Sequence, residues 1–142
     1  MTLAFWDSSA FVKLLVDEIG SDEAEALWND AAPAAASRLV VPEVSAALAA
    51  ARRAGRLDAA AHRVSQQEWA RYTAEVDFVE LTPALAERSA ALATEHDLSG
   101  ADAVHLATAL QLRDPSVVVA TWDRRLAGAA NAEGLVVIPQ ST

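Results

Sequence analysis

The chain has 142 residues, of which 53% are hydrophobic and 22% are charged, and it contains no cysteine. This length fits a single domain over residues 1-142, and the composition is that of a globular protein rather than a disordered or collagen-like one. Without cysteine the chain has no disulfide, thiolate metal site or cysteine nucleophile. The net charge of -9 opposes general attraction to nucleic acids or anionic membranes. A nucleic acid would therefore have to bind a part of the surface that departs locally from this negative charge.

The sequence carries no sign of a membrane segment or of an internal boundary. No stretch reaches the roughly 20 apolar residues of a membrane span, and Asp7 interrupts the first apolar stretch before a signal-peptide core develops. No Ser/Gly linker or repeat divides the chain. We therefore expect a cytoplasmic protein without a membrane partner.

Short apolar segments alternate with helical patterns along the chain. In chain order we predict a strand at 2–6, helices at 10–16 and from Ser21, a strand at 38–41 and a helix from Pro42. A helical segment ending near Tyr72 follows, then a strand at 76–81, a helix from Thr82 and a helix at 101–112. The last elements are a strand at 117–121, a helix at 124–132 and a strand at 135–138. The alternation predicts an α/β fold, a three-layer α/β/α sandwich around a central, mainly parallel sheet.

Four acidic residues take similar places in this pattern: Asp7, Glu43 and Asp123 follow predicted strands, and Asp102 begins a predicted helix. Because ligands of open parallel sheets bind at the carboxyl ends of the strands, we expect these acids to converge. Carboxylates gathered in a partly dry cleft repel one another, and hard oxygen ligands favour Mg²⁺ or Mn²⁺ as the compensating ion. One or two such ions, with a metal-activated water, would suit phosphodiester hydrolysis.

Other interpretations of these acids remain open at this stage. Each one, taken alone, is explained equally well as a residue that caps a helix or interacts with its dipole. An Asp after the first strand also occurs as a phosphoryl acceptor in haloacid-dehalogenase-like hydrolases and response-regulator receivers. Those hydrolases have a second Asp where this chain has Ser9, and both classes use a late lysine, whereas the one lysine here is Lys13.

A more specific pattern is carried by four segments: Asp7-Ser8-Ser9-Ala10, Pro42-Glu43-Val44, residues 101–109 (ADAVHLATA), and Thr121-Trp122-Asp123-Arg124-Arg125-Leu126. In this order they resemble the PIN-domain ribonucleases, specifically the VapC-type toxins of bacterial type II toxin–antitoxin systems. The resemblance spans nearly the whole chain. It implies a PIN-like fold and a metal-dependent endoribonuclease.

The resemblance also implies roles for individual residues. Asp7 and Asp102 correspond to the family's metal ligands, and Glu43 and Asp123 complete the acidic pocket directly or through water. The implied cofactor is Mg²⁺, with Mn²⁺ as the alternative. Hydroxyls of two supporting residues, Ser9 and Thr121, are expected to hydrogen-bond a ligand carboxylate or a metal-bound water. His105 is interpreted as a packed structural residue rather than a catalytic one.

The implied partners are an RNA substrate, a cognate VapB-type antitoxin and a second copy of the chain in a homodimer. The antitoxin would block the pocket, for example by inserting a basic side chain among the carboxylates. Basic residues that could guide an RNA backbone are Lys13, Arg52, Arg53 and Arg56, although a solvated helical face is the favoured explanation for the arginines and ordinary surface placement for Lys13. The alternative function is a catalytically silent PIN-like module that binds RNA or protein.

Overall fold

A five-stranded sheet forms the centre of the fold, described here from a computed structural model that covers residues 3–30, 33–112 and 116–139. The strands are β1 (Leu3–Trp6), β2 (Ala34–Ser37), β3 (Val76–Val79), β4 (Val117–Ala120) and β5 (Val136–Ile138). They lie in the order β3-β2-β1-β4-β5, and each neighbouring pair is parallel.

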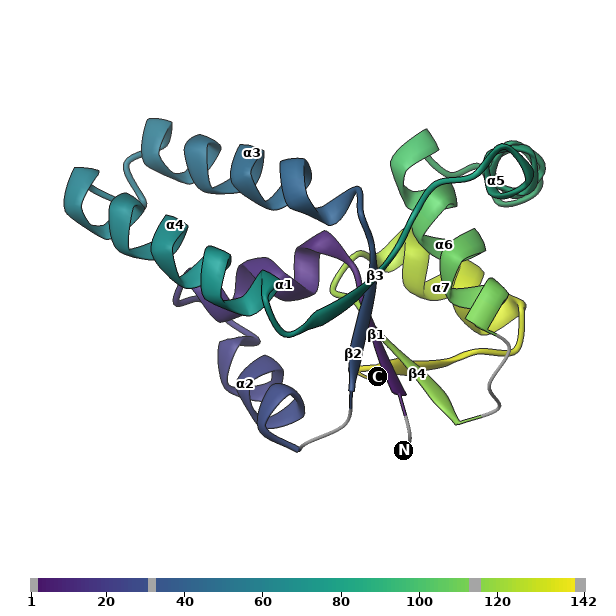
Figure 1. Ribbon diagram of the computed structural model, residues 1–142, viewed down its shortest axis with the longest axis horizontal. Helices are drawn as coiled ribbons and strands as arrows, with labels where there is room; N and C mark the ends of the chain where they lie inside the picture. Colours follow the sequence, from purple (N-terminus) through teal and green to yellow (C-terminus); the bar gives the residue numbers. More distant parts are fainter. Residues whose placement is uncertain (1–2, 31–32, 113–115, 140–142) are drawn as a thin grey trace.

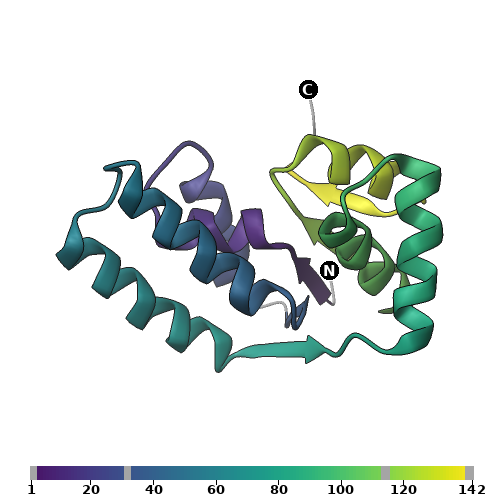
Figure 2. The same ribbon diagram turned by 90° about the horizontal axis from the view of Figure 1, so that it is seen from above.

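Helices cover both faces of this sheet (Figures 1 and 2). One face carries α1 (Ser8–Leu15), α2 (Ser21–Asn29), α3 (Val40–Arg53) and α4 (Ala59–Thr73). The other face carries α5 (Pro83–His96), α6 (Gly100–Leu112) and α7 (Arg124–Ala132). The predicted three-layer α/β/α sandwich is therefore confirmed. Within the described part of the chain, no helix combines the length and apolar character needed to cross a membrane.

The core has two parts because successive side chains of a strand point to opposite faces of the sheet. From β1, Ala4 and Trp6 pack with Phe11 on the side of α1–α4. Phe5, between them in sequence, packs with Leu106 and Val119 on the side of α5–α7. Burial on both faces explains why β1 and β4 are continuously apolar.

The predicted strand at 38–41 is wrong. The strand in this region is β2, formed by three alanines and a serine that are all buried, and α3 already begins at Val40. Alanine is a weak strand former, but β2 lies between β1 and β3 and its position is set by its neighbours rather than by propensity. Pro42 fits the first turn of a helix, so the apolar residues before it join α3, and Glu43 lies in that first turn rather than directly after a strand.

The other predicted strands match β1, β3, β4 and β5 with ends that differ by up to two residues. Thr2, at the start of the first predicted strand, lies outside the described residues.

The strand order creates a switch point beside β1. The chain passes from β1 to β2 and β3 on one side, then returns to β4 and β5 on the other. The connections that leave β1 and β4 therefore diverge at the same edge of the sheet, which is where open α/β sheets bind ligands. Asp7 follows β1 and Thr121 follows β4, so both residues stand at this switch point.

Gly20, the N-cap of α2, lies against the indole ring of Trp122 in the connection after β4. Its φ is +98°, and a Cβ added there would lie 2.6 Å from Nε1 of Trp122. We expect Gly20→Ala to lower the free energy of unfolding by about 1–3 kcal/mol, because the conformation is strained and the ring must move. Urea denaturation measures this loss.

The matched control is Gly55→Ala. Gly55 also has a positive φ, +79°, but nothing lies within 4 Å of an added Cβ. This variant therefore reports the backbone cost alone, and equal losses in the two variants would contradict a role for the Trp122 contact.

Candidate metal centre

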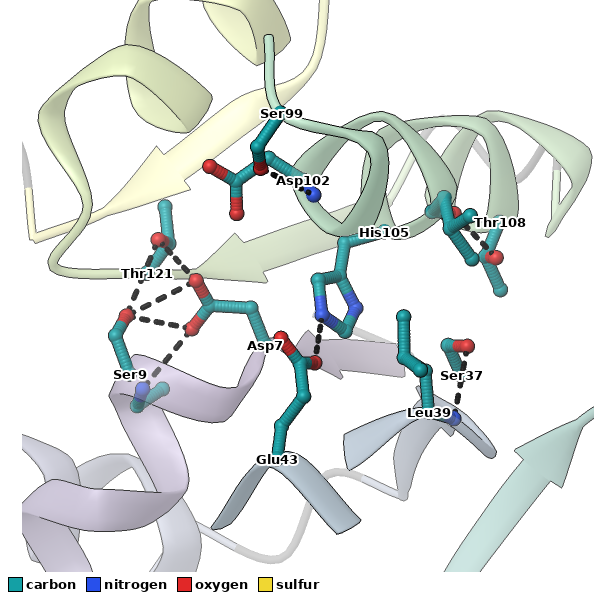
Figure 3. Close-up of polar contacts among 12 residues, drawn as sticks. Asp7, Ser9, Ser37, Leu39, Glu43, Ser99, Asp102, His105, Thr108 and Thr121 are labelled. Carbon is teal, nitrogen blue, oxygen red and sulfur yellow. Dashed lines mark hydrogen bonds and ion pairs between the residues drawn. The ribbon is translucent and has the colours of Figure 1, made fainter. Parts of the chain in front are cut away.

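Asp7 is held from both sides of the switch point. Its side chain is 2% exposed and caps α1, where the backbone N–H of Ala10 donates to Oδ1 at 2.9 Å. The hydroxyl of Thr121 donates to Oδ2 at 2.6 Å, and Oγ of Ser9 lies 2.7 and 2.9 Å from the two carboxylate oxygens (Figure 3). Contacts from α1 and from the end of β4 thus fix the carboxylate.

Ser9 and Thr121 also connect Asp7 to the turn that carries Asp123. The backbone N–H of Trp122 donates to Oγ of Ser9 at 2.9 Å, and that of Asp123 donates to Oγ1 of Thr121 at 3.0 Å. Each hydroxyl therefore contacts Asp7 while accepting from the β4–α7 turn. The resemblance assigns a supporting role to both Ser9 and Thr121. Their role in catalysis stays a prediction.

Glu43 extends from the first turn of α3 toward α6. Its Oε1 lies 2.6 Å from Nε2 of His105, and the side chains of Glu43 and His105 are 26% and 1% exposed. In Figure 3 the side chains of Glu43 and His105 meet beside Asp7, with Asp102 on the same helix as His105. The sequence analysis missed this contact, although His105 follows Asp102 by three residues and so shares its side of the helix.

Helix capping explains only two of the four predicted acids. Asp7 caps α1, and Asp123 caps α7 by accepting from the N–H of Leu126 at 2.9 Å. Glu43 makes no cap hydrogen bond in α3. Asp102 is not the acceptor at the start of α6, because its own N–H donates to Oγ of Ser99 at 3.2 Å.

The acids disfavour one another's ionised forms. Burial raises the pKa of the Asp102 carboxyl, and the negative charges of Asp123 and, to a smaller extent, Glu43 raise it further. Burial also raises the pKa of Asp7, against the opposing hydrogen bonds from Thr121, Ser9 and Ala10. A cation would relieve both effects, and a set of carboxylate oxygens suits Mg²⁺ or Mn²⁺, so the residues present fit such an ion.

The four predicted acids, Asp7, Glu43, Asp102 and Asp123, together form what we call the acidic region, but they are not a tight cluster. Among the described residues, three ligand atoms lie within 4.8 Å of one another only at Glu95, His96 and Glu133, which join the ends of α5 and α7. There His96 and Glu133 form an ion pair at 2.8 Å. Mg²⁺ keeps several waters and is bound directly by few carboxylates, so the wider spacing of the four predicted acids agrees with ligation partly through water.

The basic residues lie apart from the acids or are already paired. Lys13 and Arg56 both contact Glu18, at 3.1 and 3.5 Å. Arg52 and Arg53 are exposed in the last turn of α3, at the opposite end of the helix from its acidic first turn. Their proposed contact with RNA stays a prediction.

Comparisons with known proteins agree with this architecture. The PIN domain family model matches residues 4–132. Ribonucleases VapC45 and VapC49, from two strains of Mycobacterium tuberculosis, are each 48% identical to the chain over 139 residues, covering 98% of this chain and 96% of the relative. VapC20 of Mycobacterium tuberculosis, described as a sarcin-ricin loop cleaving toxin, matches in structure with a TM-score of 0.70 and 22% identity, over 94% of this chain and 96% of that one. The chain therefore belongs to the PIN-domain family and, within it, to the VapC ribonucleases.

Proposed function

We propose that this chain is a divalent-metal-dependent endoribonuclease and the toxin of a type II toxin–antitoxin pair. The observation that supports the proposal is the buried Asp7 carboxylate at the switch point, together with Asp102 in the first turn of α6. Burial raises the pKa of both carboxyls, and the charges of Asp123 and Glu43 raise that of Asp102 further. The ribonuclease relatives at 48% identity support the same reaction.

In this proposal Asp7 and Asp102 hold the ion, and Glu43 and Asp123 complete its surroundings directly or through water. When bound, Mg²⁺ or Mn²⁺ supplies a Lewis acid for the scissile phosphate and makes water a stronger nucleophile near neutral pH. The protein holds the ligand side chains in place. Ser9 and Thr121 fix the Asp7 carboxylate by hydrogen bonds, so its oxygens need little reorientation when an ion binds.

The proposed partners follow from the family. RNA is the substrate, and the toxin acts as a homodimer in the cytoplasm. A VapB-type antitoxin inhibits it by occupying the acidic region. A basic antitoxin side chain would suit the region, because it offsets the same repulsion that raises the pKa of Asp102. The net charge of -9 argues that RNA binds through a limited surface, with the exposed Arg52 and Arg53 as candidates.

The test uses the purified chain, free of antitoxin, incubated with total bacterial RNA in Mg²⁺ or Mn²⁺ and, separately, in EDTA. New RNA ends are mapped by sequencing, and an Asp7→Asn/Asp102→Asn double variant is run beside the wild type. We expect discrete, metal-dependent ends that the variant does not produce. RNA retention without cleavage would support instead the catalytically silent binding module.

A further inference from the structure

The contact between His105 and Glu43 joins a buried side chain to an acid of the proposed metal centre. Nε2 and Oε1 are 2.6 Å apart, within the range of a short, charge-assisted hydrogen bond. Because an ionised carboxylate only accepts hydrogen bonds, an N–H at Nε2 is the donor that pairs with the ionised form of Glu43.

The remainder of the imidazole makes no polar contact. Nδ1 is buried and has no hydrogen-bond partner among the described residues. The ring packs edge-on against Phe5, with centroids 6.5 Å apart, in the apolar layer between the sheet and α6. An apolar residue of similar size would fill this space without leaving a polar atom unpaired. Glu43 is therefore the one hydrogen-bond partner of the ring among the described residues.

Glu43 depends on that partner for a fixed direction. Its side chain is 26% exposed, and its one side-chain hydrogen bond among the described residues is to His105. The bond to His105 occupies one carboxylate oxygen and leaves Oε2 for another ligand. By comparison, Asp7 receives hydrogen bonds on both oxygens.

We propose that His105 is a positioning residue that directs Glu43 into the acidic region through the Nε2–Oε1 hydrogen bond and so strengthens metal binding. This inference rests on the proposed function, because it takes Glu43 as a member of the metal centre. His105 itself is not a ligand: its donating nitrogen faces Glu43, and its other nitrogen is enclosed in the core.

The experiment is a double-mutant cycle on Mn²⁺ affinity, measured from the EPR signal of the free ion. The variants are His105→Leu, Glu43→Ala and their combination, each checked by thermal melting. We expect His105→Leu to weaken Mn²⁺ binding about 10-fold, the lower end of the range for partners of metal ligands, while the melting temperature stays equal or rises. In the Glu43→Ala background the same substitution should have no further effect.

A second pair of variants separates the hydrogen bond from packing. His105→Gln places an amide donor near the position of Nε2 and should keep most of the affinity, whereas His105→Asn is too short to reach Glu43 and should lose it. This pair decides the question if His105→Leu does not fold. Equal affinities for Gln and Asn, or losses that add in the cycle, would overturn the proposal.

Cleavage of RNA is scored separately on the same proteins. A wild type that binds Mn²⁺ and shows the coupling but cuts no RNA would refute the ribonuclease assignment and uphold the role of His105. A wild type that cuts RNA without coupling between the two positions would refute the role of His105 alone.

Discussion

Replacing Asp7 with Asn should abolish metal-dependent RNA cleavage while the chain remains folded. Asn keeps the size of the side chain and an oxygen for the N–H of Ala10, but it removes the negative charge at the switch point. The loss should exceed the roughly 10- to 100-fold that follows removal of a partner of a metal ligand, because a proposed ligand itself is changed. Cleavage of a defined RNA at saturating Mg²⁺ and Mn²⁺ measures the effect, and circular dichroism establishes the fold.

The chain offers a matched control in Asp58→Asn. Asp58 caps α4 as Asp7 caps α1, with the N–H of Ala61 donating to its Oδ1 at 2.8 Å, but it is exposed and outside the acidic region. The control should keep full cleavage activity. If Asp7→Asn cut RNA as fast as Asp58→Asn does, the role of Asp7 as a ligand would be untenable.

Divalent ions should stabilise the fold most strongly near neutral pH, and Asp102→Asn should remove much of this effect. Burial and the charges of Asp123 and Glu43 raise the pKa of Asp102, so its ionised form is disfavoured in the folded state. Without an ion, this carboxyl costs no stability below its unfolded-state pKa of about 4, and the cost grows as the pH rises through the folded-state value. A bound cation offsets the cost, and at 100 times its Kd it adds about 2.7 kcal/mol.

Thermal melting with and without Mn²⁺, at several values between about pH 4 and pH 8, measures both effects. Asp102→Asn should raise the melting temperature at neutral pH without ions and flatten the dependence on pH. A variant less stable than the wild type at neutral pH, with an undiminished Mn²⁺ shift, would contradict both the electrostatic argument and the ligand role.

The sequence predicts those parts of the molecule whose signals are local. The run before Asp7 is short, apolar and followed by two serines, and the structure has β1 followed by the capped helix α1. The three valines of β4 and the helix from Arg124 to Ala132 are likewise found where periodicity and β-branching place them. Resemblance at the four motifs adds the family, which the comparisons confirm.

Features set by tertiary contacts escaped prediction. The alanines of β2 carry no strand signal, because their position depends on β1 and β3, which pair with them on either side. The contact of His105 with Glu43 joins residues 62 positions apart on two helices, and periodicity within either helix does not reveal it. The spacing between the four acids is likewise a property of the folded chain.

The pairing of β1 with β4 determines when a nascent chain becomes able to act. Asp7 is made well before its partner, because the hydroxyl that donates to its Oδ2 belongs to Thr121, 114 positions later. A ribosome-bound chain therefore has no complete acidic region until β4 and the following turn have emerged and joined the sheet. Until that stage the Asp7 carboxylate lacks the Thr121 hydroxyl that fixes it, although Asp7 itself has already been made.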